Sequence, residues 1–175
     1  MNESELPISI RQAAPSDVPV ILALIKELAE YERLLDGVTA TPELLHTALF
    51  GSRPVAEALI AEGGGEALGF ALFFHNFSTF LGRPGIYLED LYVRPHARRR
   101  GIGRALLSRL AQLARERECG RLEWSVLDWN EPAIRFYRNI GARPMDEWTV
   151  FRVTGDALGR LASGEIAEGD GTEAV

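Results

Sequence analysis

Cysteine, histidine and lysine are scarce in this 175-residue chain, and each shortage excludes a class of protein. The lone Cys119 cannot form a disulfide within the chain, so we expect no disulfide framework. The three histidines, His46, His75 and His96, fall in unrelated segments without metal-ligand spacing, so we expect no metal site. Lys26 is the only lysine, and the Gly-Lys-Ser/Thr loop of P-loop proteins is therefore absent.

Long apolar runs are absent as well. No stretch approaches the ~18 apolar residues of a membrane span, so we expect no membrane partner. The acidic start MNESELPISI differs from a signal peptide, which begins with basic residues and continues with apolar ones. We therefore expect a cytoplasmic protein.

The composition fits one globular domain with a tail. Hydrophobic residues make up 46% of the chain, which is enough for a buried core. Residues 162–175 carry four acids and no base, as is typical of a disordered segment. We expect a single domain over residues 1–161 and an acidic, disordered tail over residues 162–175. Of the net charge of −6, the tail holds −4, and the remaining body of charge −2 does not attract nucleic acid.

The spacing of apolar residues predicts a mixed sheet flanked by helices, an α/β (α+β) fold. Ser16 or Asp17 is placed to cap the first helix, and Asn130 and Gly141 mark the start and end of the last one. In chain order we expect a strand around 8–11, helices within 15–34 and 42–50, strands at 55–62, 66–77 and 86–93, a helix from 102, a strand at 121–127, a helix at 130–141 and a strand at 148–153.

Two adjacent acids lie within the predicted strand at 86–93. Side chains alternate along an extended strand, so Glu89 and Asp90 are expected on opposite faces. Both acids can serve one site only if a bulge interrupts the alternation. Without a bulge, Tyr87, Leu91 and Val93 share the face of Glu89, whereas Leu88 and Tyr92 share that of Asp90.

The stretch RPHARRRGIGRALL, residues 94–107, joins this strand to the next helix. The first N–H groups of a helix have no internal partner and lie at the positive end of its dipole, which favours a phosphate. Gly101 and Gly103 allow close backbone approach, and several N–H groups in sequence suit a pyrophosphate. A dinucleotide site would need a longer glycine motif after the first strand. Taken alone, the glycines could equally turn the chain while the arginines form a solvated face.

Neighbouring motifs favour a binding role. Arg98-x-x-Gly101-x-Gly103, followed by Asn130-Glu131-Pro132 and Phe136-Tyr137, resembles the acyl-CoA site of the GNAT N-acetyltransferase superfamily. LIKELAEYE, YLEDLYV, GIG and DWNEPAIRFYRNIGA are similar to segments of the diamine (spermidine/spermine) and thialysine acetyltransferases. The resemblance covers about residues 8–161. It implies a mostly antiparallel mixed sheet with splayed central strands, and a homodimer.

The resemblance also implies acetyl-CoA as cosubstrate. Its pyrophosphate would bind the backbone of residues 99–104, and its pantetheine arm would lie where the strands at 86–93 and 121–127 part. Backbone groups of Leu91 and Val93 would pair with that arm and polarise the thioester carbonyl. The residues assigned to the cofactor are Leu91, Tyr92, Val93, Arg98, Arg99, Arg100, Gly101, Ile102, Gly103, Arg104, Asn130, Pro132, Ala133 and Tyr137.

Acetyl transfer to an amine needs a base and an acid. An amine of pKa ~10.4 is unprotonated in only about one molecule per thousand at neutral pH. By family position Glu89 is the base, acting through a water, and Tyr137 protonates the departing thiolate. Asp90, Tyr31 and Glu32 would bind the cationic substrate. Without the resemblance, Glu89 and Asp90 could be surface carboxylates. Tyr31 and Glu32 could merely end a helix, and Tyr137 could be a core aromatic residue.

The identity of the amine stays open between several small cations. Acidic residues suit a polyamine or diamine. Leu127-Asp128-Trp129 is closer to the thialysine branch, and Glu123 departs from the diamine pattern, so a lysine-like or peptide amine is an alternative. A non-catalytic CoA-binding module would keep the loop, and a nucleic-acid binder would need a wider basic surface with stacking aromatic residues.

Replacing Tyr137 by Phe tests the general-acid role. Proton transfer from tyrosine (pKa ~10) to a thiolate (pKa ~8.5) is uphill by about 2 kcal/mol, so the site has to assist it. We expect Tyr137→Phe to lower turnover strongly and to leave acetyl-CoA affinity nearly unchanged, as measured by thiol release and by cofactor titration. Unchanged turnover would remove Tyr137 from the mechanism.

Overall fold

The computed structural model describes residues 7–165 and divides the chain into two compact units, 1–127 and 128–175. Each unit is described by itself below. A single domain over residues 1–161 stays a prediction, and most of the predicted acidic tail lies outside the described residues. Within residues 7–165, no helix is long and apolar enough to cross a membrane, and no group of His, Cys, Asp and Glu side chains could hold a metal ion.

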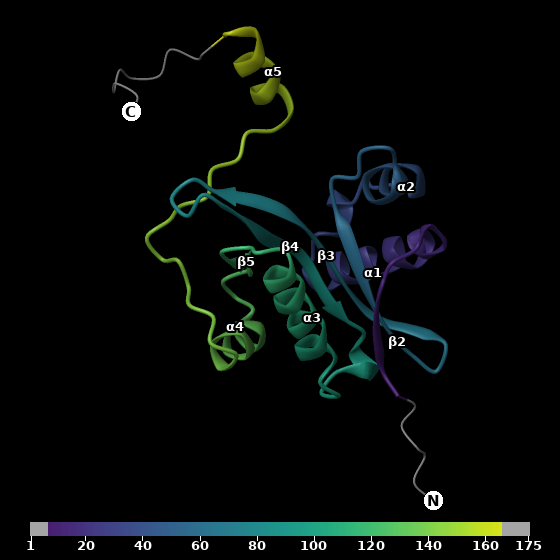
Figure 1. The fold of residues 1–175 in the computed structure, drawn as a ribbon. Coiled ribbons are helices and arrows are strands. Elements are labelled where there is room, and N and C mark those ends of the chain that lie inside the picture. The colour runs from purple at the N-terminus through teal and green to yellow at the C-terminus, as the bar shows by residue number, and fades with distance from the viewer. Residues whose placement is uncertain (1–6, 166–175) are drawn as a thin grey trace, which may run out of the picture. The chain divides into compact units, whose positions relative to one another are not determined.

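The first unit is built on a five-stranded mixed sheet with the strand order β1-β2-β3-β4-β5 (Figure 1). The first four strands pair antiparallel, and β5 joins β4 in parallel. This arrangement confirms the predicted mixed, mostly antiparallel sheet flanked by helices. The strands are β1 Ser9–Gln12, β2 Glu57–Gly63, β3 Glu66–Ser78, β4 Arg83–Val93 and β5 Leu122–Trp124.

Helices cover both faces of this sheet (Figure 1). On one face, α1 (Val18–Tyr31) and α2 (Pro42–Phe50) pack with Ile60, Phe70 and Tyr92 in one apolar cluster. On the other face lies α3 (Ile102–Glu116), which buries its apolar stripe. Burial of these two faces supplies most of the driving force for folding. Three short 3₁₀ turns lie between these elements, namely η1 Pro15–Asp17, η2 Leu35–Gly37 and η3 Pro95–Ala97.

A bulge in β4 changes which side chains share a face. Leu88 lies opposite Phe73 and Asp90 lies opposite Leu72, so Glu89 is an extra residue without a partner on β3. Phe73 and Leu72 are consecutive and point to opposite faces, and cross-strand partners share a face. Leu88 and Asp90 therefore lie on opposite faces, which corrects the strict alternation expected from the sequence. The bulge required for a joint role of the two acids is present.

The described part of the second unit holds two helices. The predicted helix at 130–141 is present as α4 (Glu131–Asn139), and α5 (Gly155–Ser163) was not predicted. The strand predicted at 148–153 is wrong: those residues form no ladder in this part of the chain, and Phe151 is 90% exposed. Apolar alternation alone does not make a strand, because a strand needs hydrogen bonds to a neighbour.

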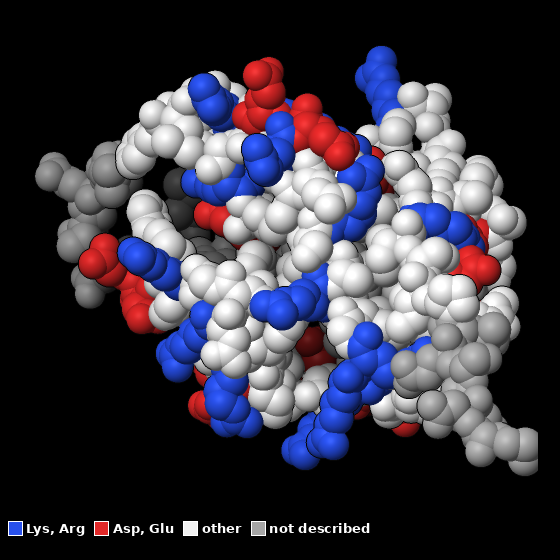
Figure 2. All heavy atoms as spheres, turned by 60° about the horizontal axis from the view of Figure 1, so that its bottom comes forward, with Lys and Arg blue, Asp and Glu red and all other residues white. Residues whose placement is uncertain are grey.

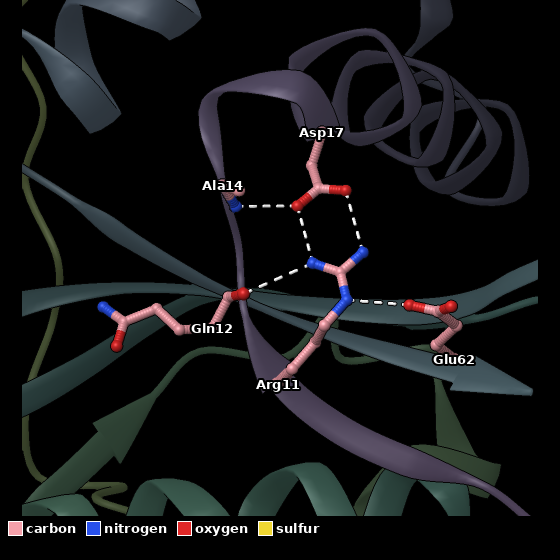
Figure 3. Close-up of polar contacts among 5 residues, drawn as sticks. All are labelled: Arg11, Gln12, Ala14, Asp17 and Glu62. Atoms are coloured by element: carbon pink, nitrogen blue, oxygen red, sulfur yellow. Dashed lines mark hydrogen bonds and ion pairs between the residues drawn. The ribbon is translucent and has the colours of Figure 1, made fainter.

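Asp17 ties β1 to the start of α1 (Figure 3). Its carboxylate accepts hydrogen bonds from Arg11 Nη1 and Nη2, at 2.7 and 2.9 Å, and from the Ala14 N–H at 2.7 Å. Arg11 Nε also donates to Glu62 of β2 at 2.7 Å. Neither Ser16 nor Asp17 caps the helix as predicted: Asp17 occupies the cap position, but its carboxylate is engaged with Arg11 and Ala14 instead. The Arg11 hydrogen bonds hold the pKa of Asp17 below its ordinary value.

Asp17→Asn should therefore destabilise the fold by about 1–2 kcal/mol, because charge-assisted hydrogen bonds are lost from a mostly buried carboxylate with a partly exposed partner. A group with a lowered folded-state pKa stabilises above its unfolded-state pKa, and this contribution disappears as pH falls through the folded-state value. Urea unfolding at neutral pH and near pH 2 measures the difference. The exposed pair is the control: Glu62→Gln should cost less, and equal losses would contradict this assignment.

Candidate active site

The loop after β4 leaves the start of α3 open. Arg99 and Gly101 adopt left-handed backbone conformations, with φ of 64° and 79°. Gly101 is the N-cap of α3, has no side chain that could cap the helix, and is followed by a first turn without acids. Figure 2 views the end of the first unit at which this loop lies, where basic side chains are prominent. The unpartnered helix N–H groups and the surrounding charge fit an anion such as a pyrophosphate.

Arg94 anchors the start of this loop and was not singled out from the sequence. Its Nη2 donates to Glu27 of α1 at 2.8 Å, and its Nη1 donates to Glu66 of β3 at 2.9 Å. The hydrogen bond to Glu27, and with it the one to Glu66, raises the pKa of Arg94 against the lowering effect of burial. Glu27 lies 67 residues away in the sequence, so no local motif reveals this contact. The interaction fixes the end of β4 against both α1 and the β2–β3 hairpin.

Arg98 connects the loop with the end of α1. Its Nε donates to the Val93 carbonyl at 2.9 Å, and its guanidinium lies 5.0 Å from the Tyr31 ring centroid and 5.6 Å from that of Tyr92. Cation–π contacts of this kind contribute about 0.5–1 kcal/mol each at exposed sites. Arg98, predicted to contact the cofactor, and Tyr31, predicted to contact the amine, are therefore in contact with each other.

The two central strands part halfway along β4. Pairing with β5 covers only Ile86 to Leu88, whereas β4 continues to Val93. The Arg94 N–H bonds Leu68 of β3, and backbone groups in a strand alternate in direction, so the N–H groups of Leu91 and Val93 point toward the opened side. The predicted splay and its two backbone donors thus lie directly after the bulge.

Three predicted acids gather at this part of β4. Burial, together with the charges of Glu89 and Glu32, raises the pKa of Asp90 to about 6. Burial also raises the pKa of Glu32, at the end of α1. Glu89 is exposed at the bulge. Asp90 is thus a partly buried carboxylate beside two others, a surrounding that an incoming cation would relieve.

The remaining predicted residues belong to the second unit. Asn130 is the N-cap of α4, and its side chain accepts a hydrogen bond from the Ala133 N–H at 3.4 Å, as predicted for a cap. Pro132 lies in the first turn of the helix. The rings of Phe136 and Tyr137 lie 5.5 Å apart, and both side chains are half-buried. The catalytic role of Tyr137 stays a prediction.

Residues 22–142 match the model of the Acetyltransferase (GNAT) family. This chain belongs to that family. The chain is therefore an N-acetyltransferase, and GNAT enzymes use acetyl-CoA as cosubstrate to acetylate an amine.

Similar GNAT proteins include enzymes that act on small amines. A thialysine N-epsilon-acetyltransferase of Bos taurus is 41% identical, over 89% of this chain and 97% of that protein. An L-ornithine N5-acetyltransferase of Arabidopsis thaliana is 34% identical, over 85% of each chain. An integron cassette protein from the mobile metagenome of V. cholerae has a solved structure that superposes with a TM-score of 0.75, at 28% identity, over 89% of this chain and 97% of that one.

Asp90→Asn should stabilise this GNAT enzyme at neutral pH and weaken amine binding. The pKa of Asp90 in the folded protein is raised to about 6, so the wild-type protein becomes less stable as pH rises from about 4 through 6. In this range the folded state still holds a proton that the unfolded state has lost. Asn carries no such penalty, so we expect a gain of about 1–3 kcal/mol at pH 7–8 and none below pH 4.

Thermal unfolding across this pH range, together with the KM for the amine, measures both effects. The exposed Asp36 of η2 supplies the matched control, and Asp36→Asn should leave both quantities unchanged. A variant less stable than wild type at pH 8 would contradict the burial argument.

Proposed function

We propose that this enzyme transfers the acetyl group of acetyl-CoA to a primary amine of a small cationic substrate, by direct attack in a ternary complex. The observation that carries the proposal is the order of features along β4. The bulge with Glu89 and Asp90 comes first, then the opened edge at Leu91 and Val93, and then the loop with the uncapped start of α3. A cationic amine and an anionic cofactor would thus meet along one strand.

Within the first unit, the cofactor would lie against β4 and the loop that follows it. The pyrophosphate would bind the backbone of Arg99 to Arg104, and the pantetheine arm would run along Leu91 to Val93. Arg98 would support the loop through Val93 and Tyr31, which is a positioning role. The residues proposed from the second unit are Asn130, Pro132, Ala133 and Tyr137.

In the proposed reaction, Glu89 removes a proton from the ammonium group through a water, and the amine lone pair then attacks the thioester carbonyl carbon. The N–H groups of Leu91 and Val93 stabilise the negative charge that forms on the carbonyl oxygen. The C–S bond breaks, the electron pair leaves with sulfur, and Tyr137 protonates the thiolate. The attacking nitrogen loses its second proton as the amide forms, and this proton restores the phenol of Tyr137. Asp90, Glu32 and Tyr31 hold the cation. The exposed position of Glu89 is consistent with a proton relay through water.

The substrate would be a thialysine-like amine, a diamine or a polyamine. The relatives act on thialysine and on L-ornithine, both small molecules with a primary amine. The acidic surroundings of Asp90 suit any of these cations. A homodimer is also proposed, because the sequence resemblance to the diamine acetyltransferases implies one.

A thiol-release screen tests the proposed function. The purified protein is mixed with acetyl-CoA and, in turn, with thialysine, L-ornithine, L-lysine, putrescine, spermidine, spermine and a peptide amine. We expect rapid release with at least one small amine, and Glu89→Gln should lower that rate by about 10²–10⁴-fold. A rise in melting temperature with acetyl-CoA, but no acetylated product from any amine, would instead establish a non-catalytic CoA-binding module.

A further inference from the structure

A second polar cluster lies on the face of the sheet that carries Asp90. Glu123 of β5 is paired with Tyr87 of β4, and Tyr87 lies opposite Phe74 of β3. Phe74 and Leu72, which is opposite Asp90, are two residues apart and share a face. Asp90, Tyr87 and Glu123 therefore point to the same side of the sheet.

The cluster combines one positive and one negative side chain. Arg121 Nε lies 2.8 Å from Glu123 Oε2, and Asn76 Nδ2 donates to the same oxygen at 2.9 Å. The side chains of Arg121 and Glu123 are 37% and 34% exposed, so solvent reaches both. The Tyr87 hydroxyl lies 2.8 Å from Ser125 Oγ, at the position where β5 begins to leave β4.

Hydrogen bonding in this cluster is incomplete. Arg121 Nε and Asn76 Oδ1 are buried and make no hydrogen bond within the described structure, although Arg121 Nε is close to Glu123. Buried polar atoms without partners cost free energy and are rare in native proteins. Because Arg121 Nε is already paired with Glu123, the cluster keeps one acceptor, Asn76 Oδ1, that a bound molecule could satisfy after a small side-chain movement.

Gly85 of β4 leaves the space that the cluster occupies. A Cβ at this position would collide with Asn76 Oδ1 and would lie 3.0 Å from Arg121 Cγ. A larger residue here would require the Asn76 side chain to move and would crowd that of Arg121. The absence of a side chain at Gly85 therefore leaves room for the polar side chains above the strand.

We propose that Arg121 and Glu123 bind the amino-acid head group of the substrate, which makes the acceptor an ω-amino acid. This inference rests on the proposed acetyl transfer to a small amine. The α-carboxylate would bind Arg121, the α-ammonium would bind Glu123, and the reacting amine would lie at Asp90. A neutral pair of opposite charges complements a zwitterion, whereas the second ammonium of a diamine would meet the like charge of Arg121.

The spacing of the two clusters matches such a molecule. Leu72 and Phe74 place Asp90 and Tyr87 about 7 Å apart along the sheet, and Glu123 lies one strand spacing of about 4.8 Å to the side. The backbone positions of Asp90 and Glu123 are therefore about 8 Å apart. The terminal nitrogen and α-carbon of a lysine-like chain are about 6 Å apart when extended. Hydrogen bonds at both ends span the difference.

Paired substrates that differ only in the carboxyl group test the inference. Kinetics of the full-length enzyme are compared for L-ornithine against putrescine and for L-lysine against cadaverine. We expect kcat/KM to favour each amino acid by about tenfold or more, because a charge-assisted contact is lost in the diamine. 6-Aminohexanoate, which keeps the carboxylate but lacks the α-ammonium, should fall between them.

Variants then assign the preference to the cluster. Arg121→Gln should raise the KM for the amino acids about tenfold to hundredfold and leave the KM values for the diamines and for acetyl-CoA unchanged. The preference for amino acids would then be abolished. Arg121→Lys should restore part of this preference. Glu123→Gln should abolish the advantage of L-lysine over 6-aminohexanoate. The matched control is Arg115→Gln, an exposed arginine of α3, which should behave as wild type.

Two results would overturn the inference. The first is equal kcat/KM for amino acids and diamines in the wild-type enzyme, which requires no variant to fold. The second is an Arg121→Gln variant that slows both classes equally. Acetylation of diamines alone would refute this inference and leave the proposed function standing, whereas no acetylated amine at all would refute both.

Discussion

The extra residue at Glu89 in β4 is the constraint on which the arrangement of the first unit depends. Without it, Asp90 would share the face of Leu88, which is buried on the side of the sheet that α3 covers. With it, Asp90 turns toward α1 and lies near Glu32, while Leu88 stays buried. One inserted residue therefore lets β4 bury Leu88 on one face and direct Asp90 to the other. The insertion lies directly after the last residue of β4 that pairs with β5.

This arrangement has an energetic cost in the unliganded protein. Burial and two neighbouring carboxylates oppose the ionised form of Asp90, and no basic partner relieves it among the causes of its pKa shift. The Arg11–Asp17 and Arg94–Glu27 pairs show the opposite pattern, in which each carboxylate is matched by a guanidinium. The enzyme thus satisfies its structural charges internally and leaves an excess of negative charge at the proposed amine site, a distribution typical of functional sites.

Much of the fold could be predicted from the sequence because its signals are local. The helix at 42–50 and the strands at 55–62 and 66–77 follow from apolar periodicity, and the loop at 94–107 follows from its glycines and arginines. The α5 helix, which was not predicted, also has local signals, namely Thr154 at its N-cap and Gly164 at its C-cap.

Features that depend on distant partners could not be predicted in this way. The bulge at Glu89 could not be predicted from the sequence, because it depends on the register between β4 and β3. It could only be named as a requirement for both acids to serve one site. The roles of Asp17 and Arg94 depend on Arg11 and Glu27, which lie in other elements. The strand expected at 148–153 failed for the same reason, because alternation gives a side-chain pattern without a hydrogen-bonding neighbour.

The contacts of Arg98 with the rings of Tyr31 and Tyr92 have a thermodynamic consequence. The guanidinium is part of the loop proposed for the anion, and Tyr31 precedes the proposed cation-binding Glu32 on α1. If one ligand orders these three side chains on binding, the second ligand no longer has to supply the entropy cost of ordering them. Linkage is reciprocal, so acetyl-CoA would tighten the amine by the same factor by which the amine tightens acetyl-CoA.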